Sequence, residues 1–204
     1  MPDTIHVFSD YACPWCYLGL ERLRQATQDQ AVDVVLLPFP LSPDTPEEGR
    51  DLRAYLAERG MDVDAARARL RGLLDEAGLP WNTQDQVFAY NTSRAQELAV
   101  WASHEAPDQL LALHDVLFRM VQVENRNVWQ LDVLREAAEE AGLDADAAVA
   151  AIDAGTHREE VLRWWAEARQ LGVRGVPTFI AGGRGVSGAQ PVEVLSRFVR
   201  EAVN

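Results

Sequence analysis

The two cysteines of the chain, Cys13 and Cys16, are three residues apart and directly follow a short apolar run. That run, residues 5–9, is rich in β-prone side chains and predicts a strand. Pro14 suits the first position of a helix, and residues 15–23 are mostly good helix formers. The chain is therefore predicted to turn from a strand into a helix at the cysteines, with Cys13 at the helix N-cap.

This placement predicts reversible thiol chemistry. At the helix start, the Cys13 sulfur faces unpaired backbone N–H groups and the positive end of the helix dipole, which favour a thiolate over a thiol. Cys16 lies one turn further along the same helix face. The two Cα atoms then fall within the separation of about 4.4–6.8 Å that a disulfide requires, so the pair can open and close with little backbone movement.

Three other interpretations compete with thiol chemistry. A zinc site needs further Cys or His ligands at short paired spacings, and the four histidines are scattered singly, at His6, His104, His114 and His157. A static disulfide that closes so short a loop constrains the unfolded chain little. Two inert buried thiols are disfavoured by the helix-start position. We therefore expect no metal site.

Composition excludes several classes of function. The chain has 204 residues, of which 48% are hydrophobic, so it can bury a sizeable core without disulfides or metals. The net charge of −13, with arginine as the one strongly basic residue type, argues against nucleic acid as a partner, because phosphate binding needs a basic patch. No stretch approaches the roughly 18 apolar residues of a membrane span.

The N-terminus predicts a cytoplasmic location. Residues 1–4 are polar and acidic, and the CxxC pair follows so soon that a removable secretory leader has no room. Cytoplasmic thiols are kept reduced, so a CxxC pair there is more often catalytic than structural.

The remaining pattern predicts a sheet that is interrupted by helices. Residues 32–37 read as a second buried strand, parallel to the first because the crossover should be right-handed. Four prolines within residues 38–46 then indicate a loop. From Glu47 to about Leu171 the pattern is helical almost throughout, with a helix start at residues 91–93.

Within this helical segment, His114 lies on an apolar stripe and is interpreted as a packed, hydrogen-bonded histidine. Trp164 and Trp165 are interpreted as core or inter-lobe contacts. At the C-terminal end, residues 172–181 form a loop that leads into a strand, residues 182–185 a hairpin turn, residues 186–187 a return strand and residues 191–203 an amphipathic helix.

The predicted fold class is therefore α/β, with sheet residues contributed by both ends of the chain. We assign residues 1–41 and 172–204 to one domain and residues 42–171 to a helical insertion. The helix at residues 158–171 is assignable to either part.

A β-α-β unit with CxxC at its first helix, followed later by Val176-Pro177-Thr178 and a β-hairpin, resembles the thioredoxin fold. The large all-helical insertion resembles the DsbA family. Five stretches in the same order are similar to its FrnE-like cytoplasmic branch, namely residues 10–19, 38–43, 91–92, 172–177 and 186–190.

This resemblance implies a cis peptide bond between Val176 and Pro177, packed beside Cys13. The Val176 backbone would then offer an edge on which an extended peptide can pair, and Thr178 would flank the site. One departure is Gln96, where relatives often carry a histidine, so no role is transferred to that position. A second is the absence of further cysteines, which rules out a built-in second disulfide relay.

The same superfamily contains 2-hydroxychromene-2-carboxylate isomerases and kappa-class glutathione transferases, which generally carry serine where Cys13 stands and use glutathione. Retention of both cysteines favours disulfide exchange. Glutathione binding stays open as an alternative, and its candidate contacts are the Val176 backbone with Ser187, Gly188 and Gln190.

The leading hypothesis is a thiol-disulfide oxidoreductase or isomerase, with Cys13 as nucleophile and Cys16 as resolving thiol. Pro14 and Trp15 are expected to tune the potential, and Asp10 is expected to be solvated. A substrate pocket is predicted from Trp15 and Tyr17 together with insertion side chains, for which Phe88, Tyr90 and Trp101 are the candidates.

We expect no required cofactor, with glutathione as a candidate co-substrate, and a thiol- or disulfide-containing peptide or protein as partner. The alternatives are a glutathione-dependent isomerase or transferase acting on a small aromatic or polyketide-like substrate, and a redox-sensitive chaperone or binding module. The direction of electron flow and the oligomeric state are left open.

Overall fold

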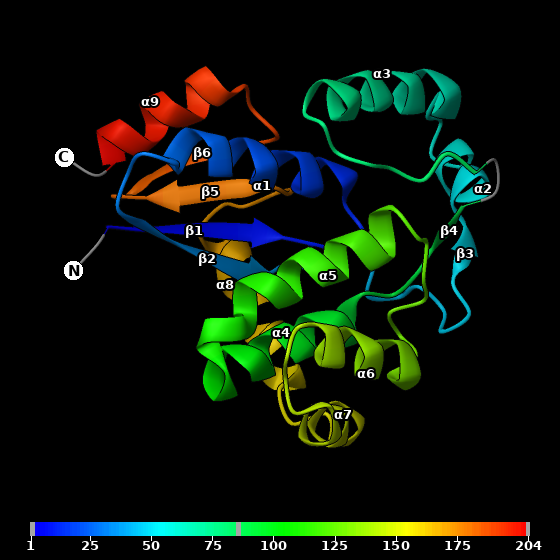
Figure 1. Ribbon diagram of the computed structural model, residues 1–204. Coiled ribbons are helices and arrows are strands. Elements are labelled where there is room, and N and C mark those ends of the chain that lie inside the picture. Colours follow the sequence, from blue (N-terminus) through cyan, green and yellow to red (C-terminus); the bar gives the residue numbers. More distant parts are fainter. Residues whose placement is uncertain (1–2, 85–86, 203–204) are drawn as a thin grey trace.

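A four-stranded mixed sheet, in the order β2-β1-β5-β6, forms the centre of the computed structural model, which describes residues 3–84 and 87–202 (Figure 1). β1 (Asp3–Ser9) is parallel to β2 (Val32–Pro38) and antiparallel to β5 (Thr178–Ala181). β6 (Arg184–Ser187) pairs with β5 in the antiparallel direction. The sheet therefore joins the two ends of the chain, as the sequence predicts.

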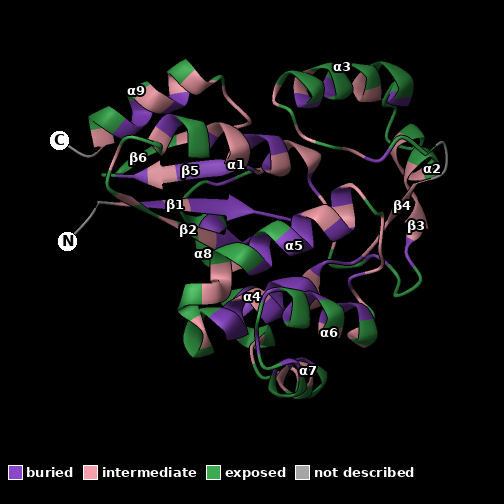
Figure 2. Ribbon diagram, in the orientation of Figure 1, coloured by how far each residue is buried: buried purple, intermediate pink, exposed green. Residues whose placement is uncertain are grey.

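Helices cover both faces of this sheet. α1 (Pro14–Thr27) and α9 (Val192–Ala202) pack on one face, where Ile5 and Val7 of β1 are fully buried (Figure 2). α8 (Arg158–Gln170) covers the other face, against Phe8. Alternate residues of β1 thus fill two different cores, as the period of two in a strand requires.

The other helices described lie in the insertion. They are α2 (Leu52–Ala57), α3 (Val63–Glu76), α4 (Ser93–Glu105), a 3₁₀ turn at Pro107–Gln109, α5 (Leu110–Gln122), α6 (Leu131–Glu140) and α7 (Ala145–Ala154). The apolar stripes of α4 to α7 form a common core that reaches Cys16 and Tyr11. The wall of the cysteine site and the core of the insertion are therefore continuous.

The insertion also contains a small sheet that the helical pattern does not predict. β3 (Arg50–Asp51) pairs antiparallel with β4 (Phe88–Ala89). The Asn125 side chain makes two hydrogen bonds to the backbone of β4. Its Oδ1 accepts from the Phe88 N–H at 2.9 Å, and its Nδ2 donates to the Phe88 carbonyl at 2.8 Å. Strands of two residues are too short to show a periodic pattern, so the sequence predicted helix or loop here.

The C-terminal hairpin is tighter than predicted. Its turn consists of Gly182 and Gly183 alone, with φ of 54° and 75°, and Ala181 pairs with Arg184. Two consecutive residues with positive φ form the type of turn that joins twisted strands closely, and glycine adopts it without a steric cost. The return strand therefore begins at Arg184 rather than Val186. The final helix begins at Val192, and residue 203 of the predicted helix lies outside the described residues.

Across residues 3–84 and 87–202, no helix has both the length and the apolar character needed to cross a membrane. This result agrees with the absence of a long apolar stretch in the sequence.

Gly19 permits the closest approach between α1 and the loop before β5. A Cβ atom at this position would lie 2.8 Å from Cγ of Pro177 and 3.3 Å from Cζ of Phe179. Pro177 directly precedes β5 and Phe179 lies within it, so both rings are held in position by the sheet. Glycine at this position allows the Pro177 loop to lie directly against the cysteine helix.

We expect Gly19→Ala to lower the free energy of unfolding by about 1–3 kcal/mol, because the added methyl group overpacks a closed contact. Gly72→Ala is the matched control, since Gly72 is also helical, in α3, and has no atom within 4 Å of its would-be Cβ. There the change should be neutral or stabilising by up to about 1 kcal/mol. Urea unfolding measures both, and equal midpoints for the two variants would contradict the close contact.

Candidate active site

Cys13 is the N-cap residue of α1, as predicted. Its backbone is extended, with φ −92° and ψ 108°, and Pro14 occupies the first helical turn. The Cys13 carbonyl accepts from the N–H of Cys16 at 2.9 Å and of Tyr17 at 3.3 Å. No side chain caps this helix end, so the first-turn N–H groups and the dipole remain available to a charge on the Cys13 sulfur.

The two thiols are free and differ in their environment. Cys13 is 6% exposed and Cys16 is fully buried. Burial raises the pKa of Cys16 well above its ordinary value, and a hydrogen bond and the charge of Cys13 raise it further. Cys16 therefore stays protonated at rest, as expected of a thiol that acts second.

A loop from the far end of the chain closes over Cys13. The Val176–Pro177 peptide bond is cis, as the family resemblance implied. The Cys13 thiol donates to the Val176 carbonyl with a sulfur to oxygen distance of 3.6 Å. Thr178, the first residue of β5, donates its hydroxyl to the Gly175 carbonyl of this loop at 2.7 Å. Residues more than 160 positions apart in sequence thus form one site.

The predicted glutathione contacts lie beside this loop. The Ser187 hydroxyl is 3.0 Å from that of Thr178, and the Gly188 N–H donates to the Pro177 carbonyl at 2.7 Å. The Gln190 amide donates to the Ser187 carbonyl at 2.8 Å. The fold brings these residues to the site, and their role in binding stays a prediction.

Asp10 is not solvated, which corrects the sequence-based prediction. It is 1% exposed and accepts from the Ala12 N–H at 3.0 Å, the Leu41 N–H at 2.6 Å and the Thr92 hydroxyl at 2.5 Å. Burial raises the pKa of Asp10, and these hydrogen bonds offset part of that effect. The sequence suggested a solvated carboxylate because two of its partners, Leu41 and Thr92, are distant in the chain.

The residues predicted to line one substrate pocket are divided among different sites. Phe88 and Tyr90 line a cavity of about 60 Å³ beside Pro14, whereas Tyr17 lines a separate cavity of about 570 Å³ between α1, β2 and α5. Trp15 packs against a small cluster formed by Leu18, Leu70 and Leu74. Trp101 is buried in the core of the insertion. The common pocket predicted from these aromatic residues is therefore wrong.

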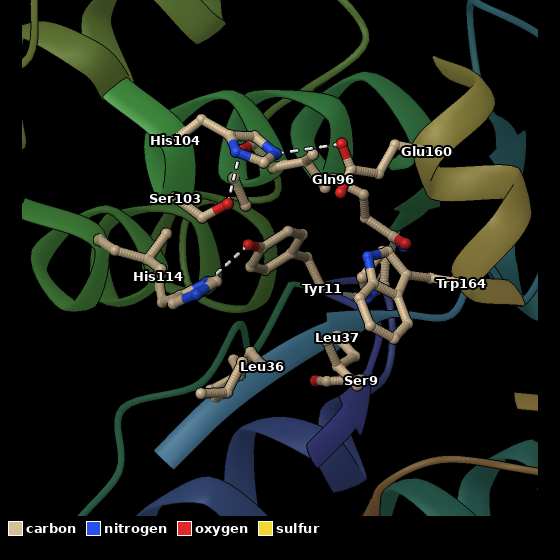
Figure 3. Close-up of a pocket in the computed structure, with 15 residues that line it drawn as sticks. Ser9, Tyr11, Leu36, Leu37, Gln96, Ser103, His104, His114, Glu160 and Trp164 are labelled. Atoms are coloured by element: carbon tan, nitrogen blue, oxygen red, sulfur yellow. Dashed lines mark hydrogen bonds and ion pairs between the residues drawn. The ribbon is translucent and has the colours of Figure 1, made fainter. Parts of the chain in front are cut away.

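His114 is packed and hydrogen-bonded, as predicted. Its Nδ1 is 2.7 Å from the Tyr11 hydroxyl, and the residue is 5% exposed (Figure 3). Burial, together with the charge of Arg24, lowers the pKa of His114 to about 4. The imidazole is thus neutral at physiological pH and fixes the loop before Cys13 to α5. Trp164 and Trp165 likewise pack against the sheet core, as expected.

One cluster has no counterpart in the sequence analysis. His104 in the last turn of α4 lies against His157 and Glu160 at the start of α8. His104 and His157 are 53 positions apart in the sequence, so no local motif indicates that they are neighbours. They meet because α4 packs against α8.

The fold and the paired thiols define the class of protein. A mixed sheet, a CxxC pair at the first helix and a cis-proline loop against the first cysteine together define a protein of the thioredoxin fold. The family described as DSBA-like thioredoxin domain matches residues 4–200. The chain belongs to this DsbA-like family of oxidoreductases and isomerases.

Similar proteins agree with this assignment. A probable DsbA oxidoreductase, SCO1869 of Streptomyces coelicolor, is 32% identical, with a TM-score of 0.87 over 98% of this chain and 89% of that one. The uncharacterized protein YwbO of Bacillus subtilis is 26% identical over 97% of both chains. The cytosolic disulfide reductase DsbM of Pseudomonas aeruginosa shares the fold, with a TM-score of 0.68 at 21% identity over 97% of both chains.

The lowered pKa of His114 predicts a loss of stability in acid. Between pH 6.5 and about 4 the unfolded chain binds a proton that the folded chain does not, so the stabilisation is complete above pH 6.5 and is lost as the pH falls through this range. We expect the free energy of unfolding of His114→Gln to fall less steeply there, by up to about 1.4 kcal/mol per pH unit. Urea titrations at several pH values measure this slope.

His6→Gln, at a histidine on β1, is the control for a general effect of removing an imidazole. If His114→Gln and the parent chain lose stability in parallel between pH 6.5 and 4, His114 does not carry the predicted proton linkage.

Proposed function

We propose that the protein is a thiol-disulfide oxidoreductase that exchanges disulfides through the Cys13-Pro14-Trp15-Cys16 motif. The observation that carries the proposal is the contact between the N-cap thiol of Cys13 and the carbonyl of Val176, the residue before the cis-proline. A nucleophilic sulfur at a helix start and a backbone edge for the substrate then lie within one small site. The membership of the DsbA-like family supports this reading.

The exchange proceeds in two displacements. The Cys13 thiolate attacks one sulfur of a substrate disulfide, the substrate S–S bond breaks, and the departing sulfur leaves as a thiolate that takes up a proton. Cys16 then loses its proton and attacks the Cys13 sulfur of the mixed disulfide. This step forms the Cys13–Cys16 disulfide and releases the second substrate thiol. Read in reverse, the same steps donate a disulfide to a dithiol substrate.

The two cysteines cannot exchange roles in this scheme. Cys16 is fully buried, so it cannot reach a protein disulfide, and its raised pKa keeps it from competing as the first nucleophile. An extended substrate segment that pairs with the Val176 backbone would hold its cysteine beside Cys13. We propose thiol- or disulfide-containing peptides and proteins as partners, with no cofactor required.

Glutathione is a second candidate ligand of the same site. The hydroxyl groups of Thr178 and Ser187 lie 3.0 Å apart next to the Pro177 loop, where they could meet polar groups of a small peptide. A solved structure of the same fold supports this candidate, namely the cytosolic disulfide reductase DsbM with GSH, with a TM-score of 0.67 at 21% identity. A 2-hydroxychromene-2-carboxylate isomerase of the same fold, with a TM-score of 0.77 at 19% identity, supports an isomerase as the alternative activity.

We also propose a cytoplasmic location, which would keep the thiols reduced between turnovers. The fold likeness to a disulfide reductase described as cytosolic supports it.

Cys13→Ser should reduce catalysis of insulin disulfide reduction to the uncatalysed rate, because the attacking sulfur is lost. Cys16→Ser should retain the attack and accumulate a mixed disulfide with the substrate, which mass spectrometry detects as a covalent adduct. The Cys13→Ser/Cys16→Ser double variant is the control and should trap nothing. An active Cys13→Ser protein would overturn the proposed chemistry.

Equilibration in graded glutathione buffers, scored by thiol alkylation and mass, should show an intramolecular Cys13–Cys16 disulfide. A midpoint between about −120 and −200 mV would indicate a disulfide donor or isomerase, and one near about −270 mV a reductase. If a glutathione adduct at Cys13 accumulates and no internal disulfide forms, the oxidoreductase proposal fails, and the glutathione-dependent isomerase or transferase takes its place.

A further inference from the structure

The end of α4 and the start of α8 bring three metal-ligating side chains together, none of them a cysteine. His104 Nε2 is 3.1 Å from Glu160 Oε2, and His157 Nδ1 is 3.8 Å from the same oxygen. One ligand atom of each residue lies within 4.8 Å of those of the other two. His157 is the N-cap residue of α8 and Glu160 lies in its first turn, three residues later, so both side chains stand at the same end of the helix.

These donors and their separations suit an ion of the zinc type. Zinc binds imidazole nitrogen and carboxylate oxygen at about 2.0–2.2 Å, so two ligands of one tetrahedral ion lie about 3.3–3.5 Å apart. The observed distances need shifts of about 1 Å or less at most of these contacts. The two imidazole rings are stacked with an interplanar angle of 17°, so one ring must turn to aim at a shared ion. His104, whose side chain is 50% exposed, is free to do so.

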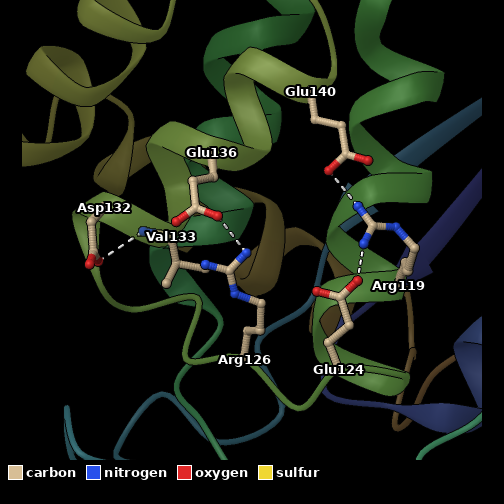
Figure 4. Close-up of polar contacts among 7 residues, drawn as sticks. All are labelled: Arg119, Glu124, Arg126, Asp132, Val133, Glu136 and Glu140. Atoms are coloured by element: carbon tan, nitrogen blue, oxygen red, sulfur yellow. Dashed lines mark hydrogen bonds and ion pairs between the residues drawn. The ribbon is translucent and has the colours of Figure 1, made fainter.

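One carboxylate oxygen of the cluster is not in contact with arginine. Elsewhere on the insertion, arginines pair with neighbouring carboxylates: Figure 4 shows Arg119 between Glu124 and Glu140, and Arg126 on Glu136. Glu160 is also paired, with Arg163, but that contact is made by Oε1 at 3.2 Å, so Oε2 faces the two histidines.

A second carboxylate, that of Glu97, interacts with the cluster through His157. The Glu97 side chain is 3% exposed, and its Oε2 has no hydrogen-bond partner among the described residues. Its charge interacts with His157 as well as with Arg158. The charge of Glu97 adds to the attraction for a cation, and the contact with Arg158 at 3.3 Å offsets part of it.

The cluster also lies at the edge of a cavity. His104 and Glu160 line a space of about 220 Å³ whose other walls include Tyr11, His114 and Trp164 (Figure 3). Three protein ligands leave one position of a tetrahedral ion open. Water or a small anionic ligand in the cavity could occupy that position.

We propose that His104, His157 and Glu160 form a binding site for one divalent transition-metal ion of the zinc type, which joins α4 to α8 beside this cavity. The site uses neither cysteine, so none of its ligands takes part in disulfide exchange. The three residues come from the last turn of α4 and from the N-cap and first turn of α8, and an ion bound there would fix the packing of these helices.

The test is titration of the full-length Cys13→Ser/Cys16→Ser protein with Zn²⁺ by calorimetry and with Co²⁺ by visible absorption. The cysteines are replaced because thiolates also bind these ions. We expect one ion per chain, a d–d spectrum without thiolate charge transfer, and a higher melting temperature in saturating Zn²⁺. His104→Ala and Glu160→Gln in this background should each weaken Zn²⁺ binding at least tenfold and reduce the thermal shift accordingly.

His6→Ala is the matched control and should bind Zn²⁺ like the parent protein. Melting curves in a chelator establish that each variant is folded, and His104→Ala, at a half-exposed side chain, is the variant least at risk. The proposal is overturned if the parent binds no ion, or if His104→Ala and Glu160→Gln bind as tightly as His6→Ala. Insulin reduction by a His104→Ala protein with both cysteines intact should match the wild-type rate, which separates this result from the proposed disulfide exchange.

Discussion

The buried carboxylate of Asp10 holds together the three segments on which the cysteine site depends. It accepts hydrogen bonds from the loop that leads into α1, from the loop that leaves β2, and from Thr92 at the start of α4. A charged group without partners would be costly at 1% exposure, whereas several donors directed at one carboxylate offset that cost. Removing the carboxylate would leave those donors buried and unpaired, so the position of Cys13 and the attachment of the insertion are set by the same residue.

Further contacts fix the cysteine loop from the side of the insertion. Gln122 in α5 donates to the Tyr11 carbonyl at 2.5 Å, and the Tyr11 hydroxyl meets His114 on the same helix. On the opposite side, the lack of a side chain at Gly19 lets the Pro177 loop pack directly against α1. The helical insertion therefore acts as a part of the site's scaffold, since the residues just before Cys13 are anchored to it rather than to the sheet alone.

Local patterns predicted those parts of the structure whose causes are local. Pro14 and the apolar run before it were sufficient for the strand, the helix and the N-cap position of Cys13, and paired glycines were sufficient for the hairpin. The cis bond before Pro177 followed from family resemblance, because sequence pattern alone gives no such preference. The burial of Asp10, the pairing of β3 with β4, and the meeting of His104 with Glu160 depend on partners dozens of residues away, and no periodicity encodes them.

The surroundings of Cys16 reconcile its burial with a role as an attacking group. Burial and the neighbouring Cys13 raise its pKa, but the backbone N–H of Asp10 and the Ser9 hydroxyl act in the opposite direction. When Cys13 is in a mixed disulfide it carries no charge, so one of the causes that keep Cys16 protonated disappears. The effects of Ser9 and Asp10, which lower the pKa of Cys16, then act against burial alone. The resolving thiol is thus held inactive while Cys13 is charged and becomes easier to ionise once Cys13 is covalently bound.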